Sequence, residues 1–123
     1  MPFVLTGRTG RIIVDVPNGH DKNWVRVCIA IDGFRTRYGR WPTRIRVPAG
    51  VLHDFRLLFA DIDFLTISSK IAFELDDVQI VAEDDEDGRY SYDDEGLSEP
   101  LPEVRTIDWF GVSVKPAPEG YPF

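Results

Sequence analysis

Cysteine, histidine and long apolar runs are all scarce in this sequence of 123 residues. The single cysteine, Cys28, cannot form an internal disulfide, and this favours a reducing compartment. No apolar run approaches the roughly 18 residues that a membrane-spanning helix needs, and the first ten residues lack the apolar core of a signal peptide. We therefore expect a cytoplasmic protein that makes no use of a membrane.

The residues that usually carry catalysis are also scarce. The only histidines are His20 and His53, and on a helix the neighbouring Asp54 would not face His53. No serine stands in the context of a nucleophile elbow, and no histidine or cysteine pair has the spacing of a metal site. We therefore expect neither an enzyme nor a bound cofactor.

The composition nevertheless predicts a folded chain. Hydrophobic residues make up 43% of the sequence and aromatic residues 12%, which is more than a disordered chain contains. The length predicts one domain, which we assign to residues 1–112. The proline-rich residues 113–123 are typical of an extended tail.

The clearest local pattern is an amphipathic helix between Asp21 and Gly39. Asp21 is suited to cap its N-terminus, Gly39 to end it in a left-handed conformation, and Pro42 to prevent it from resuming. Gly33 lies inside the pattern at a cost of about 1 kcal/mol relative to alanine. At 100° per residue one broad apolar stripe forms, which contains Trp24, Val27, Cys28, Ile31, Phe34 and Tyr38.

Alternating segments on both sides of this helix predict strands. Residues 11–16 and 43–47 would form a β-α-β unit with parallel strands and a right-handed crossover. A second helix follows over residues 48–62, and a short helix is favoured over a strand for 63–69. An antiparallel β-meander with a DDEDG hairpin tip at 84–88 is predicted for residues 70–75, 78–82 and 89–92. Residues 104–112 would form an edge strand or a short helix. The predicted fold is a small two-layer α+β domain with both main helices on one sheet face.

The charge is distributed unevenly along the chain. Residues 1–60 contain ten basic and four acidic residues, whereas residues 61–123 contain four basic and seventeen acidic ones. Two interpretations remain open: the two halves attract each other within the fold, or the imbalance steers recognition of a charged partner.

Arginines cluster around the end of the first predicted helix, and the candidate binding residues are Arg37, Arg40, Trp41, Arg44 and Arg46. Arginines suit phosphate groups, and a tryptophan suits base stacking. However, the isoelectric point of 4.7 is far below that of a typical nucleic-acid-binding domain, and the helical arginines do not share one face. Nucleic acid is therefore only the alternative partner.

The acidic hairpin partly matches a calcium-binding loop. Glu83, Asp85, Asp87 and Asp94 fall at positions 1, 3, 5 and 12 of an EF-hand loop, with Gly88 at position 6. The first and last ligands have exchanged residue types, and the flanking segments alternate as strands. We therefore expect a hydrated hairpin tip, with divalent-cation binding as an alternative.

The sequence as a whole favours a non-enzymatic protein-interaction or regulatory module. Its partner would be a protein, with a second copy of the chain as one choice. Val25 and Ile29 lie away from the main apolar stripe of the first helix. They would pack either against a second layer of the same chain or against another subunit in a homodimer.

Overall fold

The computed structural model describes residues 3–5, 12–14 and 23–112. The cap predicted at Asp21 and the tail predicted for residues 113–123 lie outside the described residues, and the domain boundary at residue 112 stays a prediction. The elements are, in chain order, β1 (Phe3–Leu5), β2 (Ile12–Val14), α1 (Asn23–Tyr38), β3 (Arg44–Val47), α2 (Ala49–Arg56), α3 (Asp61–Ser68), β4 (Ala72–Leu75), β5 (Val81–Glu83), β6 (Arg89–Ser91), α4 (Tyr92–Glu95) and α5 (Thr106–Phe110).

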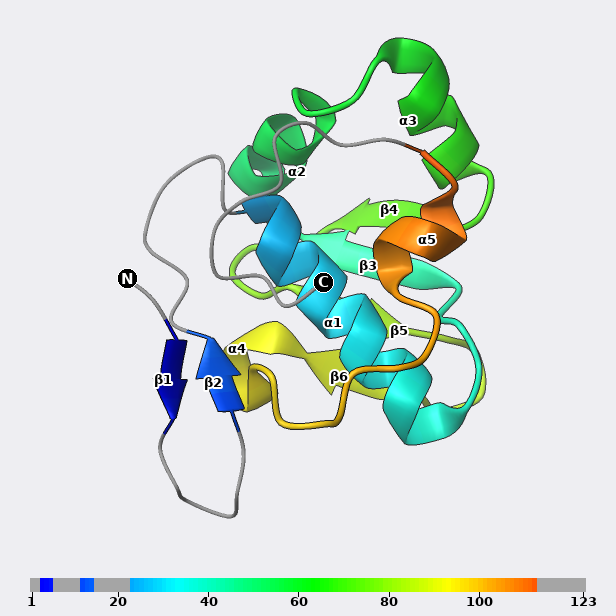
Figure 1. Ribbon diagram of the computed structural model, residues 1–123. Helices are drawn as coiled ribbons and strands as arrows, with labels where there is room; N and C mark the ends of the chain where they lie inside the picture. The colour runs from blue at the N-terminus through cyan, green and yellow to red at the C-terminus, as the bar shows by residue number, and fades with distance from the viewer. Residues whose placement is uncertain (1–2, 6–11, 15–22, 113–123) are drawn as a thin grey trace.

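The helices accompany a four-stranded mixed sheet with the order β4-β3-β5-β6 (Figure 1), and this confirms a small α+β domain. β3 pairs with β4 in parallel, whereas β3 with β5 and β5 with β6 are antiparallel. β1 and β2 form a separate antiparallel pair. None of the helices in the described part of the chain has the length and apolar content that crossing a bilayer requires.

The predicted pairing of residues 11–16 with residues 43–47 is wrong. β2 pairs with β1, and the parallel neighbour of β3 is β4, so α2 and α3 form the crossover. A partner close in the chain costs β2 less loop entropy than a partner beyond α1. The meander is wrong for the same topological reason, because β3 lies between β4 and β5.

Several local predictions are confirmed. Gly39 ends α1 with a φ of +73°, and its N–H donates to the Arg35 carbonyl. The 84–88 tip connects two antiparallel strands, and the segment 104–112 contains the short helix α5. The predicted helix over 48–62 is too long, because α2 ends at Arg56. The short helix favoured for 63–69 is confirmed as α3, which begins two residues earlier at Asp61.

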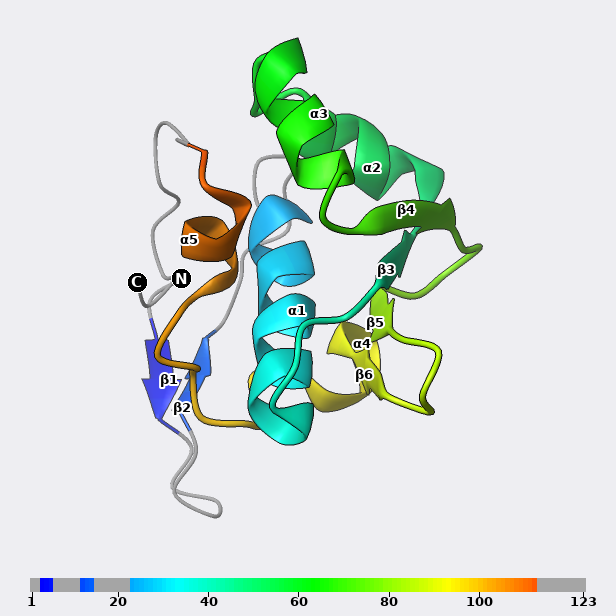
Figure 2. The ribbon, with the colours of Figure 1, turned by 90° about the vertical axis from the view of Figure 1, so that its right-hand side faces the viewer.

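α1 lies at the centre of the molecule, between the sheet and α5 (Figure 2). Val25 and Ile29 are each only 1% exposed, so they pack within the chain and not against another subunit. Their side of α1 faces α5, where the Asp32 carboxylate accepts hydrogen bonds of 2.8 Å from both the N–H and the hydroxyl of Thr106. The helix is therefore buried on two opposite sides, which explains why its apolar residues extend beyond one stripe.

Gly33 allows α1 to approach the sheet closely. A Cβ atom at this position would lie 2.3 Å from Cζ of Tyr90, because the aromatic ring lies against the helix backbone. The Tyr90 hydroxyl continues outward to the Gly96 carbonyl at 2.7 Å. The missing side chain at Gly33 thus makes room for Tyr90, the one aromatic residue of β6.

Gly33→Ala and Gly50→Ala form a matched pair that tests this contact. Alanine is the better helix former by about 1 kcal/mol. Nothing lies within 4 Å of a Cβ at Gly50, so Gly50→Ala should raise the free energy of unfolding by about 0.5–1 kcal/mol. Gly33→Ala should lower it by about 1–3 kcal/mol, because the Tyr90 ring has to move. Urea denaturation measures both, and a Gly33→Ala variant as stable as the wild type would contradict the described packing.

Candidate functional site

One face of the sheet points away from α1 (Figure 2). This outer face carries charged side chains. Burial alternates along β3, so Ile45 and Val47 face the core while Arg44 and Arg46 face outward. Arg44 lies opposite Glu83 of β5, and Glu83 lies opposite Arg89 of β6. Positive and negative residues therefore alternate across three neighbouring strands.

The outward arginines are paired with acids from the second half of the chain. Arg44 Nε lies 3.1 Å from Glu83 Oε1, and a terminal nitrogen of Arg44 lies 2.7 Å from Asp85 Oδ1. Arg46 contacts Asp76 at 2.9 Å. Exposed ion pairs of this kind each contribute about 0–1 kcal/mol. Together they support the interpretation that the two oppositely charged halves attract each other.

The remaining predicted binding residues lie elsewhere. Arg37 forms ion pairs with Glu95 and Glu99, and its guanidinium lies 4.7 Å from the centre of the Tyr90 ring. Trp41 stacks on Trp109 of α5, with ring centres 4.3 Å apart and an interplanar angle of 2°. The five-residue site stays a prediction, but the structure divides its members: Arg40, Arg44 and Arg46 meet acids of residues 76–85, whereas Arg37 and Trp41 hold the segment that leads to α5 against the body.

Asp84 organises the hairpin tip. Its Oδ1 accepts hydrogen bonds from the N–H of Glu86 at 3.0 Å and of Gly88 at 2.8 Å, and its Oδ2 accepts one from Arg40. The Arg40 guanidinium is the main cause that lowers the pKa of Asp84 to about 2, and the two backbone donors add to it. The sequence analysis missed this residue, although an aspartate at the start of a tight turn is a known signal for such bonds.

Three of the four carboxylates considered for a cation face arginines instead. Glu83 and Asp85 contact Arg44, and Asp94 lies 3.8 Å from Arg89. Across the described ranges, no three His, Cys, Asp or Glu side chains group closely enough to hold a metal ion. The exposed Asp87 adopts a φ of 71°, which closes the turn.

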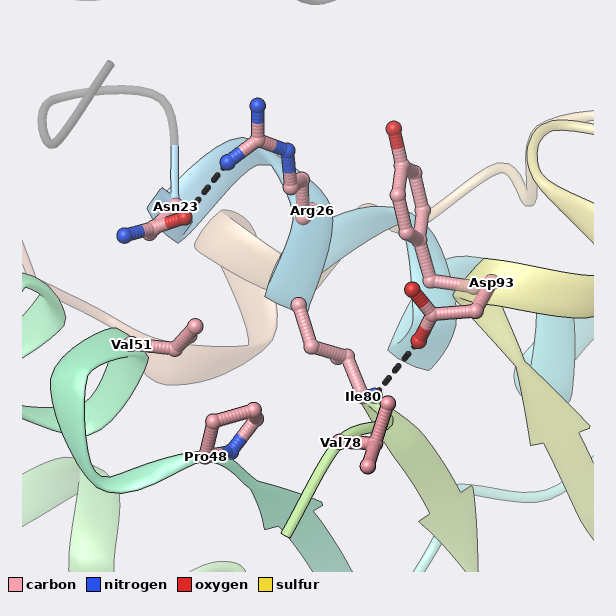
Figure 3. A pocket seen from close by; sticks show the side chains of 8 residues that line it. Asn23, Arg26, Pro48, Val51, Val78, Ile80 and Asp93 are labelled. Atoms are coloured by element: carbon pink, nitrogen blue, oxygen red, sulfur yellow. Dashed lines mark hydrogen bonds between the residues drawn. The ribbon is translucent and has the colours of Figure 1, made fainter. Parts of the chain in front are cut away.

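A pocket of about 370 Å³ opens beside the first turn of α1 (Figure 3), and it is lined by Asn23, Arg26, Pro48, Val51, Val78, Ile80, Tyr92 and Asp93. Its polar groups join elements of the chain to one another. The Asp93 carboxylate accepts a bond of 2.8 Å from the Ile80 N–H, and the Asn23 amide donates to Asp54 at 2.8 Å. These bonds hold α4 to β5 and α1 to α2, which assigns the polar wall a structural role.

Large exposed apolar side chains concentrate in one stretch of the chain. Five of the six in the described residues belong to residues 57–78: Leu57, Ile62, Leu65, Leu75 and Val78. This stretch, the apolar crossover segment, begins directly after α2 and contains all of α3, all of β4 and the first residues of the loop that follows β4. Exposed apolar side chains mark interaction surfaces where they lie next to one another, and Ile62 and Leu65 of α3 do so at a spacing of three residues.

α3 is apolar on two opposite sides. Ile67 is buried, and the Phe64 ring packs 5.3 Å from that of Phe73. Ile62 and Leu65, which share the other side at a spacing of three residues, are 69% and 65% exposed. The sequence left this segment ambiguous because its apolar residues follow no single helical face.

A scan of protein-family models, a search of curated proteins and a search of solved structures find nothing that matches this chain. Its function therefore has to be inferred from its own geometry.

Replacing Asp84 with asparagine should make the free energy of unfolding depend less on pH in the acidic range. The folded pKa of about 2 lies below the ordinary value of about 3.9. The ionised carboxylate therefore stabilises the fold above about pH 4, and this contribution is lost as the pH falls toward 2. Asp84→Asn should destabilise the protein clearly at about pH 5 and much less at about pH 2.5, by urea denaturation. The exposed neighbour Asp85 provides the control variant, Asp85→Asn. If Asp84→Asn lowered the free energy of unfolding equally at both pH values, the lowered pKa assigned to Asp84 would be contradicted.

The paired arginines should not bind nucleic acid at physiological salt. A labelled duplex at micromolar protein, followed by fluorescence anisotropy over a salt series, checks this. If the interpretation is wrong, binding will be salt-sensitive, and Arg44→Ala and Arg46→Ala will each reduce the slope of log affinity against log salt by about 1.

Proposed function

We propose that this chain is a non-enzymatic protein-interaction module that binds a protein partner through the exposed side of α3. One observation carries the proposal: α3 is apolar on both sides, and within the described residues only the side of Phe64 and Ile67 is covered. Exposed apolar residues that lie together on one side of a helix mark a candidate contact surface. Covering Ile62 and Leu65 would each contribute up to about 1.5–3 kcal/mol of apolar burial.

The corner between α2 and α3 adds a recess to this surface. A pocket of about 170 Å³ is lined by His53, Arg56, Leu57, Asp61 and Phe64. Arg56 lies over the Phe64 ring at 4.8 Å, so the recess combines Leu57 and Phe64 with charged side chains. A partner could place one apolar side chain here while its neighbours cover α3, as interface anchors commonly do.

The first partner to test is a second copy of the chain. Val25 and Ile29, the earlier grounds for a homodimer, are buried inside the fold and no longer support it. The exposed side of α3 supports it instead, because a two-fold axis brings the same patch onto itself. An antiparallel crossing would also keep the acidic first turns of the two helices, with Asp61 and Asp63, apart.

The proposal includes a regulatory role without catalysis and a cytoplasmic location. The absence of catalysis and the cytoplasmic location both rest partly on Cys28, the one cysteine of the sequence. Burial, and after it the nearby Asp32 carboxylate, raises the pKa of this thiol, so Cys28 remains protonated and a poor nucleophile. No geometric observation favours the alternatives of nucleic-acid or cation binding.

Light scattering tests the dimer. We expect the wild type to have about twice the monomer mass of 14.0 kDa. The double variant Ile62→Ser/Leu65→Ser should be monomeric. At a protein concentration low enough for the wild type to dissociate as well, the free energy of unfolding of the variant should stay within about 0.5 kcal/mol of the wild-type value, because both side chains are exposed on the single chain. Val104→Ser, which changes the exposed apolar residue outside the crossover segment, is the matched control and should remain dimeric. A wild-type mass of 14.0 kDa at the highest soluble concentration would contradict the dimer.

A further inference from the structure

β4 ends the sheet on one side, with β3 next to it and no described strand beyond it (Figures 1 and 2). Three of its four residues are exposed. The fourth, Phe73, is half-buried and packs beneath α2 and α3, where its ring lies 5.4 Å from Phe55 and 5.3 Å from Phe64. An edge strand of this kind is a template for a further strand.

The backbone pairing shows which groups the edge offers. The N–H of Ala72 donates to the Thr43 carbonyl at 3.0 Å, and the N–H of Asp76 donates to the Val47 carbonyl at 2.9 Å. In a parallel ladder, alternate residues bond to the same neighbour. The N–H and C=O groups of Phe73 and Leu75 therefore point away from β3, toward the open edge.

The side chains of this edge divide between its two faces. Leu75 shares the core-side face with Phe73 but is 64% exposed, so an added strand would cover it. Glu74 lies on the outer face, opposite Arg46 in the register. The Arg46 guanidinium instead contacts Asp76 and Glu83, and within residues 23–112 Glu74 makes no ion pair. Its charge is left to attract a cation on an incoming strand.

Glu74 also disfavours pairing between two copies of this edge. Only one antiparallel register bonds Phe73 to Leu75 of the other copy and Leu75 to its Phe73. That register places the two Glu74 residues directly opposite each other, as a non-hydrogen-bonded pair with Cα atoms about 4.5 Å apart. Like charges at this spacing destabilise a sheet, whereas opposite charges stabilise it. In this register, which uses all the outward groups of Phe73 and Leu75, a strand with a cation opposite Glu74 is therefore favoured over a second copy of the edge.

We propose that the β4 edge binds an extended basic segment of a protein partner by antiparallel strand addition. A lysine or arginine lies opposite Glu74, and apolar residues lie opposite Phe73 and Leu75, where they cover the exposed leucine. Main-chain hydrogen bonds hold such a segment, and the alternating side chains select it. This inference rests on the proposed function as an interaction module and adds the chemical class of a second partner.

Synthetic peptides test the inference on the full chain. The probe is blocked Thr-Val-Lys-Val-Thr, and its matched control has glutamate in the central position. Nuclear magnetic resonance titration of the ¹⁵N-labelled protein should show the lysine peptide binding about tenfold more tightly, with the largest shifts at the Phe73 and Leu75 amides. Glu74→Lys should reverse the preference, and Glu74→Gln should nearly abolish it. Glu74 is exposed, so both variants should keep the wild-type unfolding midpoint.

A third peptide tests the backbone contacts. N-methylation of both valines removes the N–H groups that would donate to Phe73 and Leu75, so this peptide should not bind. No binding of the lysine peptide, equal binding of the lysine and glutamate peptides, or binding of the methylated peptide would each overturn the inference. If strand addition fails while Ile62→Ser/Leu65→Ser still breaks the dimer, the proposed function stands without it. If the peptides behave as expected and the wild type is monomeric, the α3 dimer is wrong and the edge site stands.

Discussion

The burial of α1 on opposite sides is the constraint on which the rest of the structure depends. The sheet must cover one side, and Gly33 permits this because the Tyr90 ring needs the space that a side chain would fill. The segment around α5 must cover the other side, where Asp32 holds Thr106. β5 and β6 supply the first cover and α5 the second, and all three come from the C-terminal half of the chain. They also bring the acidic half of the chain against the basic half, so the outward arginines find carboxylates within the fold.

The exposed apolar residues follow from the same topology. The parallel pairing of β3 with β4 requires a crossover connection. α2 and α3 form this connection near the N-terminal end of α1 (Figure 1). Only one side of α3 can pack there, so Ile62 and Leu65 remain exposed. β4 is the last strand of the sheet, and its outer edge remains open. The two surfaces proposed for partners, the exposed side of α3 and the outer edge of β4, are thus parts of the fold that do not cover α1.

Sequence patterns predicted the structural features that depend only on residues close together in the chain. The end of α1 at Gly39, the alternation along β3 and the 84–88 hairpin each depend on a few adjacent residues, and each was predictable. Strand partners were not, because residues 11–16 and β4 have equally suitable patterns and only long-range packing distinguishes them. The same limit applies to the candidate site. Among the five consecutive acids at 83–87, the start of the tight turn is the one local signal that indicates the inward position of Asp84. Nothing near Trp41 shows that it stacks on Trp109.

On the proposed function, partners bind the apolar crossover segment and not the arginine-rich residues 35–46. Amide hydrogen exchange at low and high protein concentration tests this directly, because association slows exchange where a partner covers the backbone or restrains its opening. The account predicts that raising the concentration slows exchange within residues 57–78, most of all in α3, and leaves residues 35–46 and 83–99 unchanged. Slower exchange confined to residues 35–46 or 83–99 would contradict it.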